Sequence, residues 1–260
     1  MLFKFFSDES YDSQTPEPRT YIVAGYFSSD AIWQNVEKRW APLNSEYGVP
    51  RFHASHLNAK TYEYDGWADP KKIEYSSKML KIITDQERAL HAFVCGIHAD
   101  EYRRIISDAG REKMGHPYLV CFKTCMALVA KEMDEGGFQP EDKIAVFIDR
   151  NPFEIEAVRI FCQLKDNPQF PYRSRLHSCT PASMDSMIAL QPSDMIAYEG
   201  FRWHHDRRAK ECKTRIVMDT ILNHNGITER YFGAKTLSGL KDGIEATVCL
   251  PNQLVILPTN

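Results

Sequence analysis

Acidic side chains at three well-separated places in the sequence have the types and positions needed for metal-dependent chemistry. Asp8 and Glu9 follow the apolar run that begins the chain, Asp149 follows the apolar run 144–148, and Asp194 lies near the start of an expected helix. Carboxylates that gather where buried strands run out are unfavourable unless something positive is bound beside them. A pair of divalent metal ions is a common solution, and phosphodiester hydrolysis is a common use of such a pair.

The composition is that of a globular protein and restricts the function only weakly. The chain has 260 residues, of which 43% are hydrophobic, enough for a full core. The net charge of −3 neither requires nor excludes nucleic acid, because binding depends on local patches. The first apolar run is too short for a secretory signal, and no apolar stretch approaches the roughly 20 residues of a membrane span. We therefore expect no membrane association.

The cysteines favour a cytoplasmic location. There are seven, an odd number, and none forms a Cys-x-x-Cys pair. We expect reduced thiols rather than disulfides. Cys121 and Cys125 lie one helical turn apart, which is compatible with zinc, but small buried apolar side chains are the expected role.

Hydrophobic runs and helical periodicity predict strands that alternate with helices. The run 143–149 is continuously apolar until its last residue, as in buried parallel strands. Strands are expected at 2–7, 21–27, 89–97, 143–149 and 175–181, with a strand-like tail at 254–257. Helices are expected at 31–47, 70–86, 100–108, 118–135, 152–165, 191–206 and 213–224.

This order predicts an α/β protein with a mixed five-stranded sheet flanked by helices. We expect a single domain over 1–260, with a helical insertion at 28–88 between the second and third strands and a C-terminal extension at 210–260. Without the insertion, the order of elements resembles the ribonuclease H-like fold.

Two short motifs carry a more specific resemblance. Asp8-Glu9-Ser10 on the first strand, together with Gln191-Pro192-Ser193-Asp194 late in the chain, resembles the DUF3800 family, which is placed in the ribonuclease H-like superfamily. The resemblance covers nearly the whole chain by element order. Members usually have Gly after the triplet, whereas this chain has Tyr11, so the backbone there is expected to turn differently. The resemblance implies a bacterial or mobile-element setting, including phage defence or toxin–antitoxin systems.

The resemblance also implies roles for the acids. In ribonuclease H-like nucleases the first strand and its neighbour in the sheet each end in an aspartate, and a late helix adds a third acid near its start. Asp8, Asp149 and Asp194 match these places as ligands of two metal ions about 3.5–4 Å apart. Hard oxygen ligands favour Mg²⁺ or Mn²⁺ over zinc.

Glu9 is expected to assist catalysis, but its geometry leaves two alternatives. Adjacent strand residues point to opposite faces of a sheet. Either the strand kinks at Glu9, or Glu9 bonds elsewhere and supports the ligands. Other acids are less well placed: Glu132 and Asp134 are expected at the wrong end of their helix, and Glu199 is rotated by roughly 140° from Asp194.

Candidate substrate-binding residues lie in three segments. Gln191 begins the late motif and is expected to position the helix start or a ligand. His53 lies three residues before His56 and is expected to face the substrate, although a surface or capping role is equally compatible. A basic run with interleaved Phe and Trp includes Arg202, Arg207 and Arg208, and it fits either a nucleic-acid backbone track or a solvated helix end.

The sequence therefore predicts a Mg²⁺- or Mn²⁺-dependent nuclease acting on RNA or DNA. The alternative is a non-catalytic binding or assembly module that keeps the same fold, with a protein partner or a second copy of the chain. Strand transfer of the transposase type uses the same acids but normally needs a DNA-binding module, and the sequence has no helix-turn-helix or zinc motif.

Overall fold

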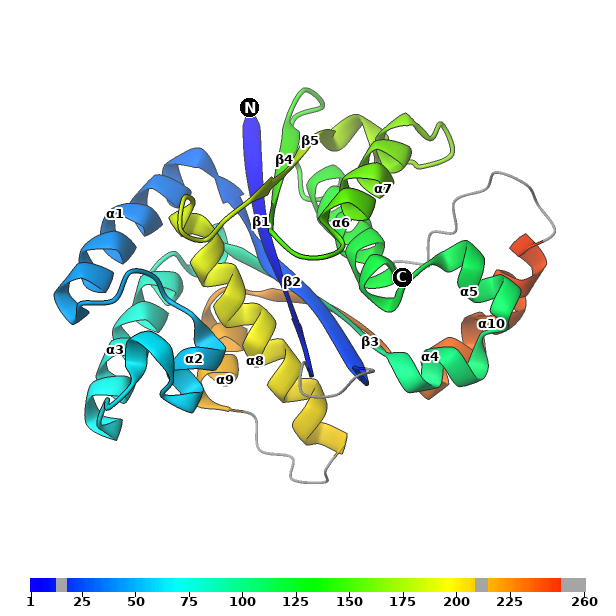
Figure 1. Ribbon diagram of the computed structural model, residues 1–260. Helices are drawn as coiled ribbons and strands as arrows, with labels where there is room; N and C mark the ends of the chain where they lie inside the picture. Colours follow the sequence, from blue (N-terminus) through cyan, green and yellow to red (C-terminus); the bar gives the residue numbers. More distant parts are fainter. Residues whose placement is uncertain (13–17, 209–214, 249–260) are drawn as a thin grey trace.

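A mixed six-stranded sheet forms the centre of the protein in the computed structural model, which describes residues 1–12, 18–208 and 215–248 (Figure 1). The strand order is β5-β4-β1-β2-β3-β6. β1 and β3 run antiparallel to β2, β4 runs parallel to β1 and β5, and β6 runs parallel to β3. The strands are β1 (Leu2–Tyr11), β2 (Thr20–Ser29), β3 (His91–His98), β4 (Lys143–Asp149), β5 (Leu176–Ala182) and β6 (Ile227–Phe232).

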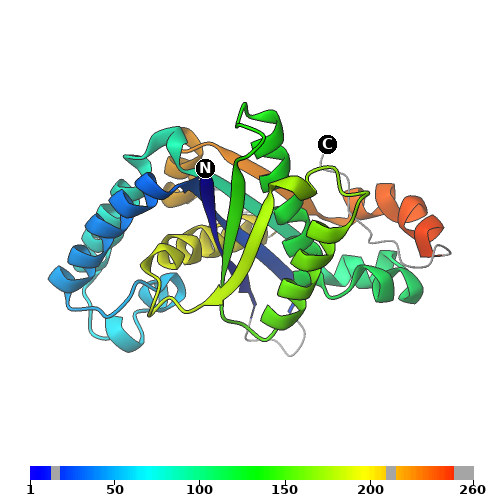
Figure 2. The ribbon, with the colours of Figure 1, turned by 90° about the horizontal axis from the view of Figure 1, so that it is seen from above.

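Helices cover both faces of this sheet and form two groups that Figures 1 and 2 show on either side of it. The first group is α1 (Asp30–Tyr47), α2 (Ala54–Ala59), α3 (Asp69–Thr84), α8 (Gln191–Arg208) and α9 (Ile216–His224). The second group is α4 (Ala99–Ile105), α5 (Asp108–Met114), α6 (Pro117–Glu135), α7 (Glu154–Asp166) and α10 (Ala234–Val248). Each group buries its own apolar core against the sheet. The predicted α/β class with flanking helices is confirmed.

The prediction of five strands is wrong by one, because β6 joins the edge of the sheet beside β3. β6 was missed because its sequence gives no apolar run. Thr228, Glu229 and Arg230 interrupt it, and Phe232 is the one fully buried residue of the strand. α5 and α10 were also missed, and the predicted helix 100–108 corresponds to α4, which ends at Ile105. The strand-like tail 254–257 lies outside the described residues.

The alternation along β1 decides which core each of its side chains meets. Phe5 belongs to the core under α6, whereas Phe6 belongs to the core under α8. On β4, Ile148 packs under α6 and Phe147 packs with the α8 core. Because side chains alternate along a strand, Asp8 and Asp149 fall on the α8 face of the sheet, and Glu9 falls on the α6 face.

Three α-helices, α1 to α3, lie between β2 and β3, where the sequence predicted a helical insertion. Trp33 and Trp40 are fully buried residues of α1, and Tyr75 of α3 joins the same core. The segment between α1 and α2 then passes close to the beginning of α8, because Phe52 N–H donates to the Gln191 side chain at 2.9 Å. This contact brings residues 51–54 beside the acids.

Candidate functional site: an acidic cluster at the β1–β4 junction

Asp8, Asp149 and Asp194 converge on the α8 face of the sheet. The parallel register pairs Ser7 with Ile148, so Asp8 and Asp149 come next on neighbouring strands, which in general lie about 4.8 Å apart. Asp194 lies in the first turn of α8, and its carboxyl hydrogen-bonds with that of Asp8. We call Asp8, Glu9, Asp149 and Asp194 the acidic cluster.

Ser193 fixes the third acid against the sheet. Its side chain is fully buried, and its hydroxyl donates to the Phe6 carbonyl of β1 at 2.8 Å. The start of α8 is thereby attached to the strand that carries Asp8. A side-chain hydrogen bond to a strand carbonyl is a strong positional constraint in a buried place, because breaking it leaves a polar atom without a partner. Ser193 belongs to the sequence motif 191–194, but the sequence alone indicated no role for it.

The carboxyls of the acidic cluster hold protons more tightly than ordinary acids. Burial raises the pKa of Asp8 well above its usual value, and the charges of Glu9, Asp194 and Asp149 raise it further. Burial also raises the pKa of Asp194 to about 7 and that of Glu9 to about 8. The pKa of Asp149 is raised by burial too, against two backbone hydrogen bonds that lower it. A bound cation would reverse these shifts, so metal binding here would release protons.

Backbone N–H groups orient three of these carboxyls. Asp194 Oδ2 accepts from Ala54 N at 2.5 Å, and Asp149 Oδ1 accepts from Met184 N at 3.2 Å. Asp8 Oδ1 accepts from Glu9 N at 2.8 Å. The donor to Asp8 is its own neighbour in sequence, whereas Ala54 begins α2 and Met184 follows β5, so the carboxyls of Asp194 and Asp149 depend on distant parts of the chain.

The structure decides between the two alternatives for Glu9. β1 keeps its regular pairing with β2 through Glu9 to Tyr11, so the strand is longer than predicted and has no kink. Glu9 Oε2 instead accepts from Asn151 Nδ2 at 2.8 Å, on the α6 side of the sheet. The charge of Glu9 still acts on Asp8, whose pKa it raises.

The carboxyl oxygens of the acidic cluster are the donor type that hard cations prefer, but they are not placed around a common point as metal ligands would be. Among the described residues, no group of three His, Cys, Asp or Glu side chains is placed so that it could hold a metal ion. The carboxyls bond instead to backbone N–H groups, to Asn151 and to one another. Buried carboxylate oxygens are nevertheless the donors that Mg²⁺ and Mn²⁺ prefer, and the side chains would have to turn from their present partners to bind them.

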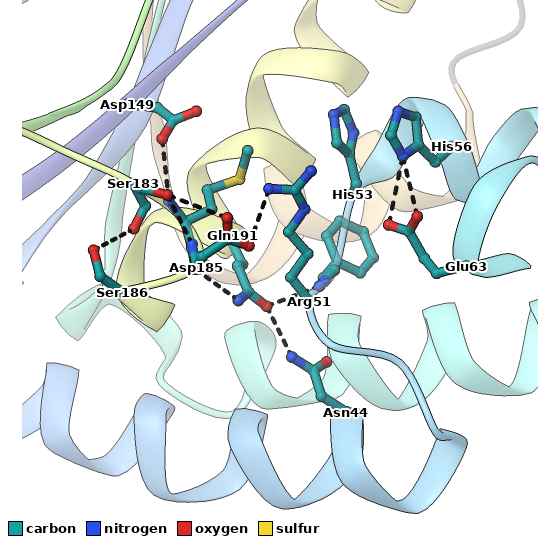
Figure 3. Close-up of polar contacts among 12 residues, drawn as sticks. Asn44, Arg51, His53, His56, Glu63, Asp149, Ser183, Asp185, Ser186 and Gln191 are labelled. Atoms are coloured by element: carbon teal, nitrogen blue, oxygen red, sulfur yellow. Dashed lines mark hydrogen bonds and ion pairs between the residues drawn. The ribbon is translucent and has the colours of Figure 1, made fainter.

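A basic side chain next to the acidic cluster was missed by the sequence analysis. Arg51 Nη1 forms an ion pair with Asp185 Oδ1 at 3.0 Å (Figure 3). Its charge lowers the pKa of both Asp149 and Asp194, so it acts on both acids. The sequence offered one signal, which is that Arg51 lies two residues before His53. Its position became meaningful only when the fold brought that segment to α8.

His53 lies beside the acidic cluster, and its contact with a substrate stays a prediction. Its Nδ1 is 3.7 Å from Asp194 Oδ1. Burial, together with the charges of His56 and Arg51, lowers the pKa of His53 to about 4. The ring is therefore neutral at physiological pH and offers a hydrogen-bonding nitrogen rather than a charge.

Gln191 has a positioning role inside the protein. It is fully buried, and its Oε1 accepts from Trp40 Nε1, Asn44 Nδ2 and Phe52 N at 2.8–2.9 Å. Its Nε2 donates to the Met184 carbonyl at 3.1 Å. The side chain thus ties α1 and the segment before α2 to the start of α8, as Figure 3 shows in part. Its contact with a substrate stays a prediction.

The predicted basic run can be placed only in part. Arg202 lies on α8, eight residues beyond Asp194, a distance of about 12 Å along a helix. The side chains of Arg207 and Arg208, and residues 209–214, lie outside the described part of the chain. Two nearby side chains contact acidic residues: His204 Nε2 lies 2.9 Å from Glu229, and Arg215 Nε lies 2.9 Å from Glu199. The nucleic-acid track therefore stays a prediction.

Comparison with known proteins adds no assignment, because no family model, curated protein or solved structure matches this chain.

Within the described residues, no helix is both long and apolar enough to cross a membrane. Cys121 and Cys125 are completely buried free thiols on α6, in agreement with the expected apolar role.

Proposed function

We propose that the protein is a Mg²⁺- or Mn²⁺-dependent phosphodiester hydrolase of ribonuclease H-like fold that cleaves RNA or DNA. The observation that carries the proposal is the meeting of Asp8, Asp149 and Asp194 on one face of the sheet, where Asp8 and Asp194 are buried, Asp149 is half-buried and all three have raised pKa values. A protein has little reason to gather carboxyls out of water unless a cation or a proton transfer uses them.

The topology supports the same proposal. Asp8 lies on the first strand, Asp149 ends the strand that runs parallel beside it, and Asp194 lies in the first turn of a late helix that packs on the first strand. These are the three places that the resemblance to ribonuclease H-like nucleases assigns to metal-binding acids. The same resemblance, through DUF3800, is the basis for proposing a bacterial defence or mobile-element setting.

The acidic cluster and the residues beside it would each have a separate role in phosphodiester hydrolysis. Asp8, Asp149 and Asp194 would hold the metal, which when bound supplies an activated water and charge stabilisation at phosphorus. Glu9 raises the proton affinity of Asp8 through its charge and is itself held by Asn151. Arg51 places a positive charge beside the site where phosphate charge develops. Neutral His53 offers a nitrogen that can accept a proton from the attacking water.

A cleavage assay tests the proposal directly. End-labelled single strands, duplexes and RNA–DNA hybrids are incubated with wild type in Mn²⁺, in Mg²⁺ and in EDTA. We expect metal-dependent cleavage, and we expect Asp149→Asn to reduce the rate by at least about 100-fold, since even the supporting partners of metal ligands contribute 10- to 100-fold. Asp166→Asn is the matched control, because Asp166 is an exposed residue at the end of α7. Absence of cleavage on every substrate would favour the non-catalytic module.

A further inference from the structure

Three stacked aromatic rings lead away from the acidic cluster. The ring centroids of His53 and His56 are 3.8 Å apart with the planes at 15°, and those of His56 and Tyr62 are 4.3 Å apart at 29°. The inner member, His53, lies beside Asp194 with a 3.7 Å contact. We call His53, His56 and Tyr62 the ring column; Figure 3 shows its two histidines next to Arg51.

The outer end of the ring column is open to solvent. Tyr62 has 76% of its surface exposed, although large apolar rings are normally covered. It also adopts a φ of 55°, which is unusual for a bulky side chain. Exposure and an unfavourable backbone conformation at the same aromatic residue indicate that Tyr62 is not there to complete a core.

The inner part of the ring column is held firmly. His56 Nδ1 lies 3.4 Å from the carboxylate of Glu63, and Thr61 N donates to the His56 carbonyl at 3.1 Å. Lys60 Nζ pairs with Asp69 at the start of α3, which secures the turn that precedes Tyr62. The rings are thus set in a stacked order before any ligand arrives, so that little conformational entropy is lost on binding.

We propose that the ring column is a stacking platform for an unpaired base of a single-stranded nucleic acid whose backbone enters the acidic cluster. This inference rests on the proposed function and narrows it to a substrate class. Every base has a face that stacks on an aromatic ring, so the contact needs no particular sequence. Bases inside a duplex are already stacked on their neighbours, whereas a single strand can place a base on Tyr62. Arg51, between the rings and the acids, is placed for the connecting phosphate.

Binding experiments distinguish the stacking of a base on Tyr62 from the electrostatic attraction of the phosphate backbone. Wild type, Tyr62→Ala and Tyr62→Phe are titrated with a fluorescent 12-nucleotide oligothymidine, an abasic strand of equal length and a 12-base-pair duplex. Ca²⁺ replaces Mg²⁺, strand integrity is checked on gels, and the titrations are repeated in EDTA. We expect oligothymidine to bind more tightly than the other two probes. Tyr62→Ala should weaken its binding by about 5- to 150-fold, the range measured for loss of one base–aromatic stack.

The controls make the result decisive. Tyr62→Phe keeps the ring and should bind oligothymidine as wild type does, and Tyr62→Ala should not change abasic binding. The melting temperature of Tyr62→Ala should stay within about 2 °C of wild type, because an exposed side chain contributes little to stability. The inference is overturned if no strand binds, if the abasic strand binds equally well, or if Tyr62→Ala has no effect. If platform binding is confirmed but no cleavage occurs, the proposed hydrolase activity fails by itself, and the reverse outcome refutes the platform alone.

Discussion

Replacing Asp194 with Asn tests whether burial of this titrating carboxyl destabilises the metal-free protein. Asn is close to Asp in shape, and its side-chain oxygen can still accept the hydrogen bond from Ala54 N. The substitution therefore removes the titrating group while leaving the contact that anchors it. We expect Asp194→Asn to be more stable than wild type in EDTA at neutral pH.

The size and pH dependence of this gain follow from the pKa of Asp194. Burial raises it from 3.8 to about 7, so the folded protein keeps a proton that the unfolded chain has already lost. Because the folded state binds more protons between these values, wild type loses stability as pH rises from about 4 to 7. At about 1.4 kcal/mol per pKa unit, the advantage of Asp194→Asn grows to about 4 kcal/mol at pH 8 and fades below pH 4.

Urea unfolding at several pH values between 4 and 8.5 in EDTA measures this difference. Comparing the two proteins cancels the contributions of histidines and other groups that both contain. Asp166→Asn serves as the control and should track wild type at every pH. Adding Mg²⁺ or Mn²⁺ at pH 8 should stabilise wild type, by about 2.7 kcal/mol at a concentration 100 times the Kd, and should not stabilise Asp194→Asn. A gap between the two proteins that stays constant across this pH range would refute the reasoning.

Three further predictions concern the stability of the fold, at a buried glutamine, at a buried lysine and at a pair of glycines. Gln191→Ala should destabilise the protein by at least about 2 kcal/mol in urea unfolding, because three buried donors lose their acceptor; a neutral result would contradict the positioning role. Burial lowers the pKa of Lys123 from 10.5 to about 8, so wild type should gain about 3 kcal/mol of stability relative to Lys123→Met between pH 7 and 10.5, whereas the lost hydrogen bond to the Met114 carbonyl is a cost of the variant that does not depend on pH; urea unfolding of both proteins over this range measures the change. Gly25→Ala would place Cβ 1.9 Å from the Phe6 carbonyl oxygen and should prevent stable folding as judged by circular dichroism, whereas Gly239→Ala meets nothing within 4 Å and should raise stability by up to about 1 kcal/mol.

The parts of the fold with strong local signals could be predicted from sequence. The apolar run that ends at Asp149 and the acids at 8 and 9 identified two central strands, and the motif around Asp194 identified the start of a buried helix. Each of these signals lies within a few residues of the group it predicts. The expected opposite directions of Asp8 and Glu9 also followed from strand geometry alone, and the regular pairing of β1 confirmed it.

The rest depends on partners that are distant in sequence. Gln191 connects two helices because its side-chain amide accepts hydrogen bonds from residues of α1 that lie about 150 positions earlier in the sequence. No local sequence pattern distinguishes such a glutamine from one that binds a ligand. Arg51 matters because the chain between α1 and α2 passes beside the acids, which only the packing of the helices decides. β6 is an edge strand that mixes polar and apolar residues, so its own sequence does not identify it as a strand. Its pairing with β3 determines its conformation.

The segment between β2 and β3 is more than an addition to the sheet, because residues 51–54 contribute to nearly every feature of the site. Arg51 supplies the nearby positive charge, His53 begins the ring column, and Ala54 N holds the carboxyl of Asp194. Phe52 N binds Gln191 and so fixes this stretch to the start of α8. The sheet therefore places Asp8 and Asp149, whereas the helical segment supplies a charge and a hydrogen bond that lower the pKa of Asp194 against the effect of burial. Changes within 51–54 should alter binding and pH dependence while leaving the sheet intact.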